Sequence, residues 1–162
     1  MTNASELPQT DRWAGLRDIA QELRHHIVHM AADSPGAHVG GSMSVTEILT
    51  VLFFDGVLRV DPAQPKMEGR DYLIFSKGHA SAALYAALAE RGFFPVEELE
   101  TYKQMGSRLA GHSLKSIPGV ELATGSLGHG LPVGNGVAMA GKYDGLPYRT
   151  FVVLGDGECQ EG

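Results

Sequence analysis

The sequence is poor in cysteine and in long apolar stretches. Its 162 residues include one cysteine, Cys159, which excludes an internal disulfide and fits a reducing compartment. The first ten residues, MTNASELPQT, hold neither a basic nor an apolar stretch, so we expect no signal peptide. No apolar run approaches the roughly 20 residues that a membrane-spanning helix needs. We therefore expect a cytoplasmic protein without a membrane partner.

The chain also lacks an excess of positive charge. Its 13 Lys and Arg residues are outnumbered by 19 Asp and Glu residues, and the net charge of -6 argues against a nucleic-acid partner. Two residue types are abundant instead, namely 21 glycines and seven histidines. Glycine lets the backbone turn tightly or approach a ligand, and histidine donates and accepts hydrogen bonds near neutral pH. Neither enrichment identifies a function by itself.

The alternation of helical and strand patterns predicts an α/β fold with a parallel sheet. We expect residues 1–10 to form a flexible tail and residues 11–162 to form the folded unit. The predicted elements are a helix over 11–32, a helix from 44 to about 54, a strand over 72–76, an alanine-rich helix over 78–91, a short helix over 95–105, a helix over 131–142 and a strand over 149–154. Two strands do not make a stable sheet, so we expect the remaining strands after residue 162 or on a partner chain.

Local signals predict several details of these helices. Apolar residues recur at every third or fourth position from Trp13 onward, which is typical of an amphipathic helix. Ser44 is followed three positions later by Glu47, the spacing of a capping box at a helix start. Gly92 is placed to close the alanine-rich helix.

The last predicted strand, FVVL, runs directly into Gly155-Asp156-Gly157. Ligands of parallel α/β sheets bind beyond the carboxyl ends of the strands, and this loop presents one carboxylate there between two glycines. Asp156 therefore suits a hard cation such as Mg²⁺, which prefers one or two carboxylates together with phosphate oxygens. Taken alone, the same three residues are more typical of a simple tight turn with a solvated Asp, and the other loops shift the balance toward a binding site.

Three histidines occur in loops that are rich in glycine or serine. His38 lies in SPGAHVGGSMS, His79 follows the first predicted strand in FSKGHAS, and His112 lies in LAGHSLK. A fourth glycine-rich segment, TGSLGHGL, leads into the helix over 131–142. Imidazoles at such positions can bind phosphates and sugar hydroxyls without carrying a permanent charge.

These segments resemble those of transketolases, and most of all the N-terminal subunit of split transketolases. The resemblance covers about residues 12–162. It rests on five motifs that occur in the family's order, namely SPGAHVGGSMS, RDYLIFSKGHASAALYAAL, AGHSLK, TGSLGHGLPVGNGVAMAGK and VVLGDGECQEG. It implies a thiamine diphosphate (ThDP) enzyme, in which this segment is the first part of a diphosphate-binding domain with a parallel sheet and helices on both faces.

The resemblance also implies roles for individual residues. Asp156 resembles the ligand of the metal ion, Mg²⁺ or Ca²⁺. His79 resembles a histidine near the diphosphate and the sugar, whereas His38 and His112 resemble histidines that hold the ketose hydroxyls and assist proton transfer. The remaining expected cofactor contacts come from the two glycine-rich loops: Gly125, Ser126, Leu127, Gly155, Gly157 and Glu158. Glu161 resembles an acid at a subunit contact, and His129 stands where many family members have Gln.

The family's cofactor motif continues from Gly-Asp-Gly to an Asn that these 162 residues do not contain. We expect that Asn, and the catalytic Glu of a pyrimidine-binding domain, on further chain or on a partner in a hetero-oligomer built on a dimer. The implied reaction transfers a two-carbon ketol unit between small sugar or keto substrates. A non-catalytic module that docks on a complete homologue is the alternative. A Rossmann nucleotide domain is disfavoured, because no G-x-G-x-x-G follows the first strand.

Two further features carry less weight. His25 and His29 lie four positions apart on the first helix, a spacing that can hold a metal, but we interpret them as part of an exposed helix face. Cys159 follows the Gly-Asp-Gly loop without a neighbouring base, and we interpret it as a small packing residue.

Overall fold

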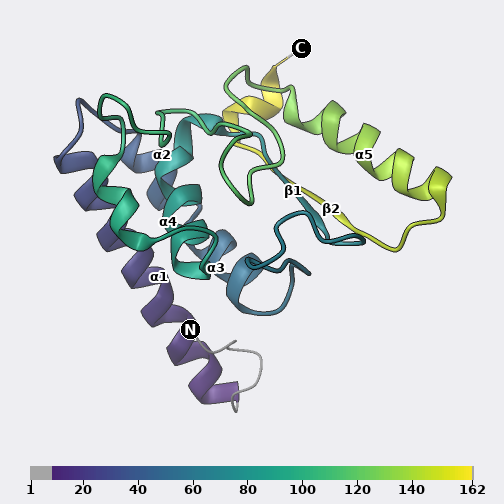
Figure 1. The fold of residues 1–162 in the computed structure, drawn as a ribbon, viewed down its shortest axis with the longest axis horizontal. Helices are drawn as coiled ribbons and strands as arrows, with labels where there is room; N and C mark the ends of the chain where they lie inside the picture. Colours follow the sequence, from purple (N-terminus) through teal and green to yellow (C-terminus); the bar gives the residue numbers. More distant parts are fainter. Residues whose placement is uncertain (1–8, 162) are drawn as a thin grey trace.

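The computed structural model describes residues 9–161, in which helices alternate with a pair of strands (Figure 1). The elements are α1 Gln9–Ala32, α2 Val39–Met43, α3 Thr46–Phe54, β1 Tyr72–Phe75, η2 Gly78–Ala80, α4 Ser81–Arg91, η3 Val96–Thr101, α5 Gly130–Asp144, β2 Thr150–Val153 and η4 Gly157–Gln160. The predicted α/β class is confirmed. Residues 1–8 of the predicted tail lie outside the described residues, and Gln9 and Thr10 belong to α1 rather than to a tail.

The two strands form a parallel pair, as predicted. Tyr72 is paired with Thr150, and Phe75 is paired with Val153. The connection between them passes through α4, η3 and α5. Because both strands run in the same direction, their carboxyl ends meet at one edge, where the backbone N–H of Ser76 donates to the carbonyl of Val153 over 2.9 Å. We call this edge the strand-end edge.

The main hydrophobic core lies on the face of the sheet that α1, α3 and α4 cover (Figure 1). Leu73 and Phe75 alternate along β1 toward this face and join Leu23 and Ile27 of α1. The alanines of α4 let this helix approach α1 and α3 closely, and the helix ends where Gly92 adopts φ 96°. Each fully buried Leu or Ile contributes about 1.5–3 kcal/mol, so this layer supplies most of the hydrophobic stabilisation.

The opposite face of the strand pair is covered by α5 (Figure 1). Close packing here depends on glycine, because a Cβ atom on Gly134 would lie 2.4 Å from Cγ2 of Val152. By contrast, a Cβ on Gly136, which lies two positions later and is exposed, would meet no atom within 4 Å. Helices on both faces of the sheet, as the family resemblance implied, are therefore observed.

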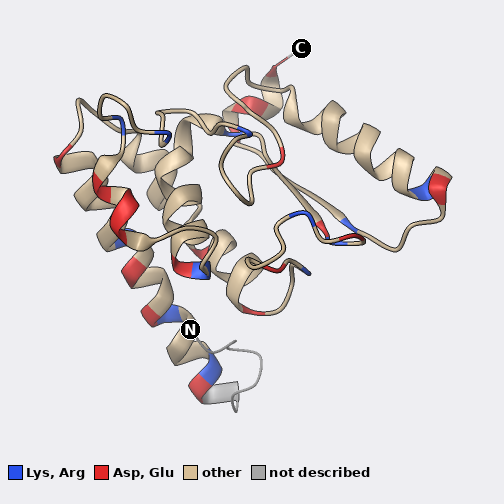
Figure 2. Ribbon diagram, viewed as in Figure 1, with Lys and Arg blue, Asp and Glu red and all other residues tan. Residues whose placement is uncertain are grey.

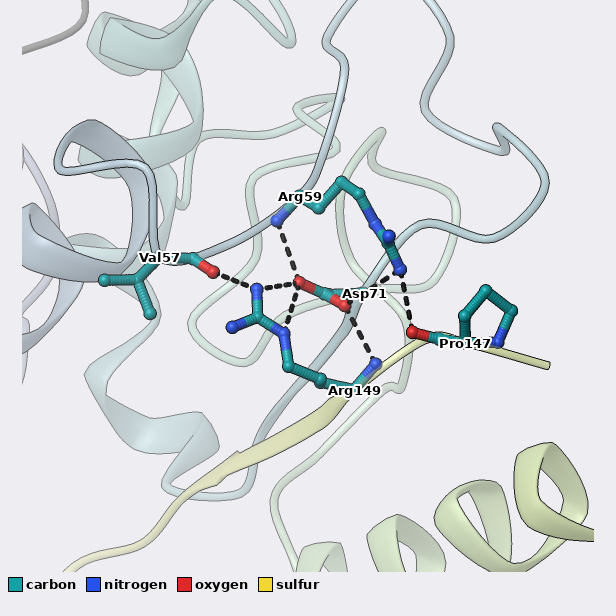
Figure 3. A network of polar contacts seen from close by, with 5 residues as sticks. All are labelled: Val57, Arg59, Asp71, Pro147 and Arg149. Carbon is teal, nitrogen blue, oxygen red and sulfur yellow. Dashed lines mark hydrogen bonds and ion pairs between the residues drawn. The ribbon is translucent and has the colours of Figure 1, made fainter. Parts of the chain in front are cut away.

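At the other end of the strands, the buried carboxylate of Asp71 fixes where they begin (Figure 3). It accepts the backbone N–H groups of Arg59 and Arg149 over 2.9 and 2.8 Å, and Nη2 of Arg149 lies 2.5 Å from Oδ2. The guanidinium of Arg149 also donates to the carbonyl of Val57, and that of Arg59 donates to the carbonyl of Pro147 over 3.0 Å. Burial alone would raise the pKa of Asp71, but the hydrogen bonds from Arg149 and Arg59 outweigh it and hold the pKa below its usual value.

Two local predictions are wrong. The capping box does not form: the N-cap of α3 is Val45, Ser44 Oγ donates to the carbonyl of Gly41, and Glu47 pairs with Arg24. The reason is that Ser44 instead ends the short helix α2, which lies within the predicted loop. Trp13 is 48% exposed, although the later positions of its apolar stripe are buried.

The short helix from Pro95 is also shorter than predicted, because η3 ends at Thr101 and Lys103 then adopts φ 56°. None of the described helices is both long and apolar enough to cross a membrane. Over the same residues, Lys and Arg are spread along several elements rather than gathered on one (Figure 2), as expected for a chain with net charge -6.

Candidate functional site

The candidate site is built on the two loops that leave β1 and β2 at the strand-end edge. Ser76, Lys77, Gly78 and His79 follow β1, whereas Gly155, Asp156 and Gly157 follow β2. The loop before α5, residues 125–129, contacts them through the N–H of Gly128, which donates to Glu158. The sequence motifs predicted as the site therefore come together at one edge, although they are separated by long stretches of chain.

Glu158 connects the three loops. Its side chain is buried, with one oxygen accepting the hydroxyl of Ser76 and the N–H of Gly128 at 3.0 Å, and the other accepting the N–H of Gly155 at 2.9 Å. Ser76 Oγ in turn accepts the N–H of Gly130 over 3.0 Å. We call these five residues the strand-end junction. Both carboxylate oxygens of Glu158 therefore accept hydrogen bonds from protein donors, and these bonds hold the three loops together.

The charge of Glu158 is maintained by this set of donors. Burial alone would raise the pKa of its carboxyl, but the hydrogen bonds from Ser76, Gly155 and Gly128 and the nearby His79 lower it below its usual value. The junction is also sterically tight, because a Cβ on Gly130 would lie 2.2 Å from Ser76 Oγ. A glycine is therefore required where α5 begins, next to a charged carboxylate.

The three predicted histidines gather beside this junction. The rings of His38 and His79 lie with their centroids 5.5 Å apart in an edge-to-face arrangement. His79 is partly buried against Gly41, and the ring of His112 lies beside Gly125, each with 3.3 Å from the nearest ring atom to the position of a Cβ on that glycine. Burial, followed by the charge of Lys77 and the proximity of His38, lowers the pKa of His79. The imidazole of His79 is therefore neutral at pH 7 and can both donate and accept a hydrogen bond.

Asp156 and Gly157 are exposed at the same edge, as are Gly125, Ser126 and Leu127 of the third loop. The carboxylate of Asp156 thus remains accessible, unlike that of Glu158 two residues later. Cys159 is exposed and its sulfur lies 3.4 Å from the carbonyl oxygen of Gly155, so its prediction as a packing residue is wrong. The sulfur points outward because Glu158, not Cys159, occupies the inward position of η4.

The sequence reasoning missed two residues at this edge. Lys77 is only 7% exposed, and its ammonium lies 3.4 Å from Ser44 Oγ. Thr124 donates to the carbonyl of Phe75 over 2.8 Å, and it leaves no room for a side chain at Gly78, where a Cβ would lie 2.6 Å from its carbonyl oxygen. The position of Lys77 directly after a predicted buried strand could have marked it as a site residue. Nothing in the sequence marks Thr124.

A large cavity lies away from this edge. It encloses about 1130 Å³ between residues 64–68, residues 115–122 and the α5 side of β1, and none of the predicted site residues lines it. Volume alone therefore does not locate the chemistry, and the convergence of histidines, an exposed carboxylate and backbone donors at the strand-end edge defines the candidate site.

Comparisons with known proteins agree with the geometry. Residues 17–162 match a family described as transketolase, thiamine diphosphate binding domain. One of the subunits of the apulose-4-phosphate transketolase of Phocaeicola vulgatus is 43% identical over 143 residues, which are 88% of this chain and 50% of that protein. Human transketolase is 37% identical over 156 residues, which are 96% of this chain and 25% of that protein. The crystal structure of Campylobacter jejuni transketolase superposes with a TM-score of 0.84 at 35% identity, covering 91% of this chain and 24% of that one.

A relative named for a sulfosugar substrate is matched over a similar share of its length. The 6-deoxy-6-sulfo-D-fructose transketolase subunit of Clostridium sp. strain MSTE9 is 44% identical over 126 residues, which are 77% of this chain and 46% of that protein. The chain thus spans about half the length of these two relatives.

Proposed function

The chain belongs to the transketolase family, through its thiamine diphosphate-binding domain, and we propose that it is the N-terminal part of an enzyme that transfers a two-carbon ketol unit between sugar-like substrates. The observation that carries this proposal is the strand-end junction, because it holds the loops after β1 and β2 and the loop before α5 around one edge. This edge presents groups suited to binding the anionic cofactor and groups suited to binding the hydroxyls of a sugar.

Asp156 is the proposed metal ligand. Its exposed carboxylate lies three residues after the end of β2 and would hold Mg²⁺ or Ca²⁺, which would balance the charge of the diphosphate. Gly155 and Gly157 let the diphosphate approach the backbone, whereas Gly125, Ser126 and Leu127 provide a surface for the rest of the cofactor. The donor set fits the group, since it combines an accessible carboxylate with glycine backbone at the carboxyl end of a parallel strand. When bound, the cofactor would supply the electron sink for cleavage of a carbon–carbon bond.

The three histidines are the proposed substrate-binding and proton-transfer groups. Several neutral donors suit a polyol better than one strong cation, because each hydroxyl needs its own hydrogen-bond partner. His79 is held neutral by burial and by Lys77, so it can accept a proton from a hydroxyl or donate one to it. His38 and His112 are exposed on either side and are available to the more distant hydroxyls.

We further propose that these residues act together with the rest of the diphosphate domain and with a pyrimidine-binding domain, on further chain or on partner chains, in a hetero-oligomer built on a dimer. Two of the relatives are named as subunits, and each is about twice as long as the segment it shares with this chain. A single carboxylate is a poor site for Mg²⁺, so we expect this chain alone to bind ThDP–Mg²⁺ weakly in calorimetry.

The test combines the chain with a complement that carries the missing Asn and Glu, and measures bound ThDP and ketol transfer. Asp156→Asn is expected to abolish cofactor retention, because it removes the charged metal ligand. Asp18→Asn, at an exposed aspartate on α1, is the matched control and should retain both. If the wild-type assembly retained ThDP but transferred no ketol unit, the chain would be a non-catalytic docking module. If Asp156→Asn retained the cofactor, the assignment of the metal ligand would be wrong.

A further inference from the structure

We propose that Glu22, His26 and Glu90 form a zinc site at the contact between α1 and α4, away from the strand-end edge. Glu22 and His26 are four positions apart and so share one face of α1, and Glu90 lies in the last turn of α4. His26 Nε2 is 2.7 Å from an oxygen of Glu90 and 3.8 Å from an oxygen of Glu22. The three ligand atoms all lie within 4.8 Å of one another.

The cluster brings two carboxylates to one imidazole. Within the described residues, neither Glu22 nor Glu90 pairs with a Lys or Arg, whereas Glu47 on the neighbouring helix α3 pairs with Arg24. The second oxygen of Glu22 lies 3.6 Å from Nδ1 of His25. The side chains of Glu90 and His26 are 9% and 17% exposed, so water compensates their polar groups poorly. Two carboxylates therefore lie at one imidazole, and that of Glu90 is in a partly dry contact, where a divalent cation would balance their charges.

The donor set and its dimensions favour zinc over magnesium. Magnesium prefers oxygen ligands, whereas zinc binds imidazole nitrogen and carboxylate oxygen together, commonly with three protein ligands and one water. Ligand atoms about 2.0–2.1 Å from a tetrahedral zinc lie roughly 3.4 Å apart, close to the distance between His26 and Glu22. Binding requires the hydrogen-bonded pair of His26 and Glu90 to separate by somewhat less than 1 Å, which side-chain rotation on two helices allows.

The cluster can also be reached from solvent. His26 lines a cavity of about 610 Å³ between α1 and η3, which also contains the acidic residues Asp33, Glu97 and Glu100. Acidic residues of η3 lie beside α1 (Figure 2), and they would attract a cation toward the cluster. A metal bound here would link α1 to the end of α4 that lies farthest from His79, so its role would be structural. This inference does not depend on the proposed ketol transfer.

The experiment is a zinc titration of the whole 162-residue chain, freed of metal with a chelator and followed by calorimetry. We expect one zinc per chain at this site, and His26→Gln or Glu90→Gln should weaken it roughly 100-fold, since loss of even an outer partner of a metal site costs about 10–100-fold. His29→Gln is the matched control, because His29 lies on the same helix outside the cluster. His79→Gln is the second control, because the three strand-end histidines also offer imidazoles to zinc.

Circular dichroism checks that each variant folds. If His26→Gln does not fold, the more exposed Glu22→Gln replaces it. Binding that survives in all the cluster variants, or that is lost only in His79→Gln, overturns the proposal. Absence of zinc binding by the wild-type chain at submillimolar concentration overturns it as well.

Discussion

Replacing Glu158 with Gln tests the central argument about the site, because this substitution preserves the size of the side chain and removes its charge. The carboxylate accepts three hydrogen bonds, from Ser76 Oγ and from the N–H groups of Gly128 and Gly155. A glutamine has one acceptor oxygen and one NH₂ group, so in either orientation at least one of the three donors faces another donor. A buried donor left unpaired costs about 1–3 kcal/mol, and the remaining bonds lose their charge assistance. We therefore expect Glu158→Gln to destabilise the fold by about 3 kcal/mol at pH 7.

The pH dependence provides a second, independent readout. The pKa of Glu158 is lowered in the folded state, so its ionised form stabilises the protein above the unfolded value of about 4.3, and this stabilisation is lost as the pH falls through the lower folded value. The difference between wild type and Glu158→Gln should therefore be largest above about pH 5 and should shrink in more acidic buffer.

The assay is urea denaturation at pH 7, pH 5 and pH 4, with Glu68→Gln as the control at an exposed glutamate. The control should differ from wild type by less than about 0.5 kcal/mol at each pH. Equal stabilities of wild type and Glu158→Gln at pH 7, or a difference that grows on acidification, would refute the argument. Either result would mean that the carboxylate does not hold the three loops together as an anion.

Four further substitutions test other parts of the structure. Gly134→Ala should destabilise the chain by about 1–3 kcal/mol in urea denaturation, because its Cβ would lie 2.4 Å from Val152, whereas Gly136→Ala meets open space and should stabilise it by up to about 1 kcal/mol; equal effects would contradict the α5 packing. Asp71→Asn should cost about 3 kcal/mol at neutral pH and less in acid, since the lowered pKa of Asp71 makes its stabilisation disappear as the pH falls; a stability unchanged at pH 7 would exclude its role at the strand starts. In the assembled enzyme, His112→Ala should retain ThDP but raise KM for the sugar or lower kcat, and loss of the cofactor instead would reverse the assigned roles of His112 and Asp156.

Much of the fold follows from local sequence signals. The strands were predicted to within one residue at each end, because YLIF and TFVV are short apolar runs that end in polar or glycine-rich loops. Gly92 was predicted to end α4, and it adopts the left-handed backbone conformation that favours glycine. These features depend on residues close in the chain, so their patterns are visible without the structure.

Other features depend on residues far apart in the chain, and these were missed or misread. A glutamate is usually exposed, and the burial of Glu158 becomes understandable only with Ser76, which lies 82 positions earlier. Ser44 carries the pattern of a helix start, but the preceding residues already form α2, so its hydroxyl bonds backward to Gly41. For the same reason the sequence drew attention to His25 and His29, whereas the carboxylate of Glu90 on α4 lies next to His26.

The separation of Ser76 and Glu158 has a consequence for how the protein is made. A ribosome adds roughly 5–20 residues per second, so Ser76 is synthesised about 4–16 seconds before Glu158. During that interval β1 and α4 are already available, but the hydroxyl of Ser76 lacks its acceptor and β1 lacks its partner. Helices fold within about a microsecond, so the α1, α3 and α4 layer can form while the strand pair waits. The contact between Ser76 and Glu158 at the strand-end edge therefore forms after the residues of the helical layer have been made, and a molecule that binds at this edge meets a chain whose helical layer is already in place.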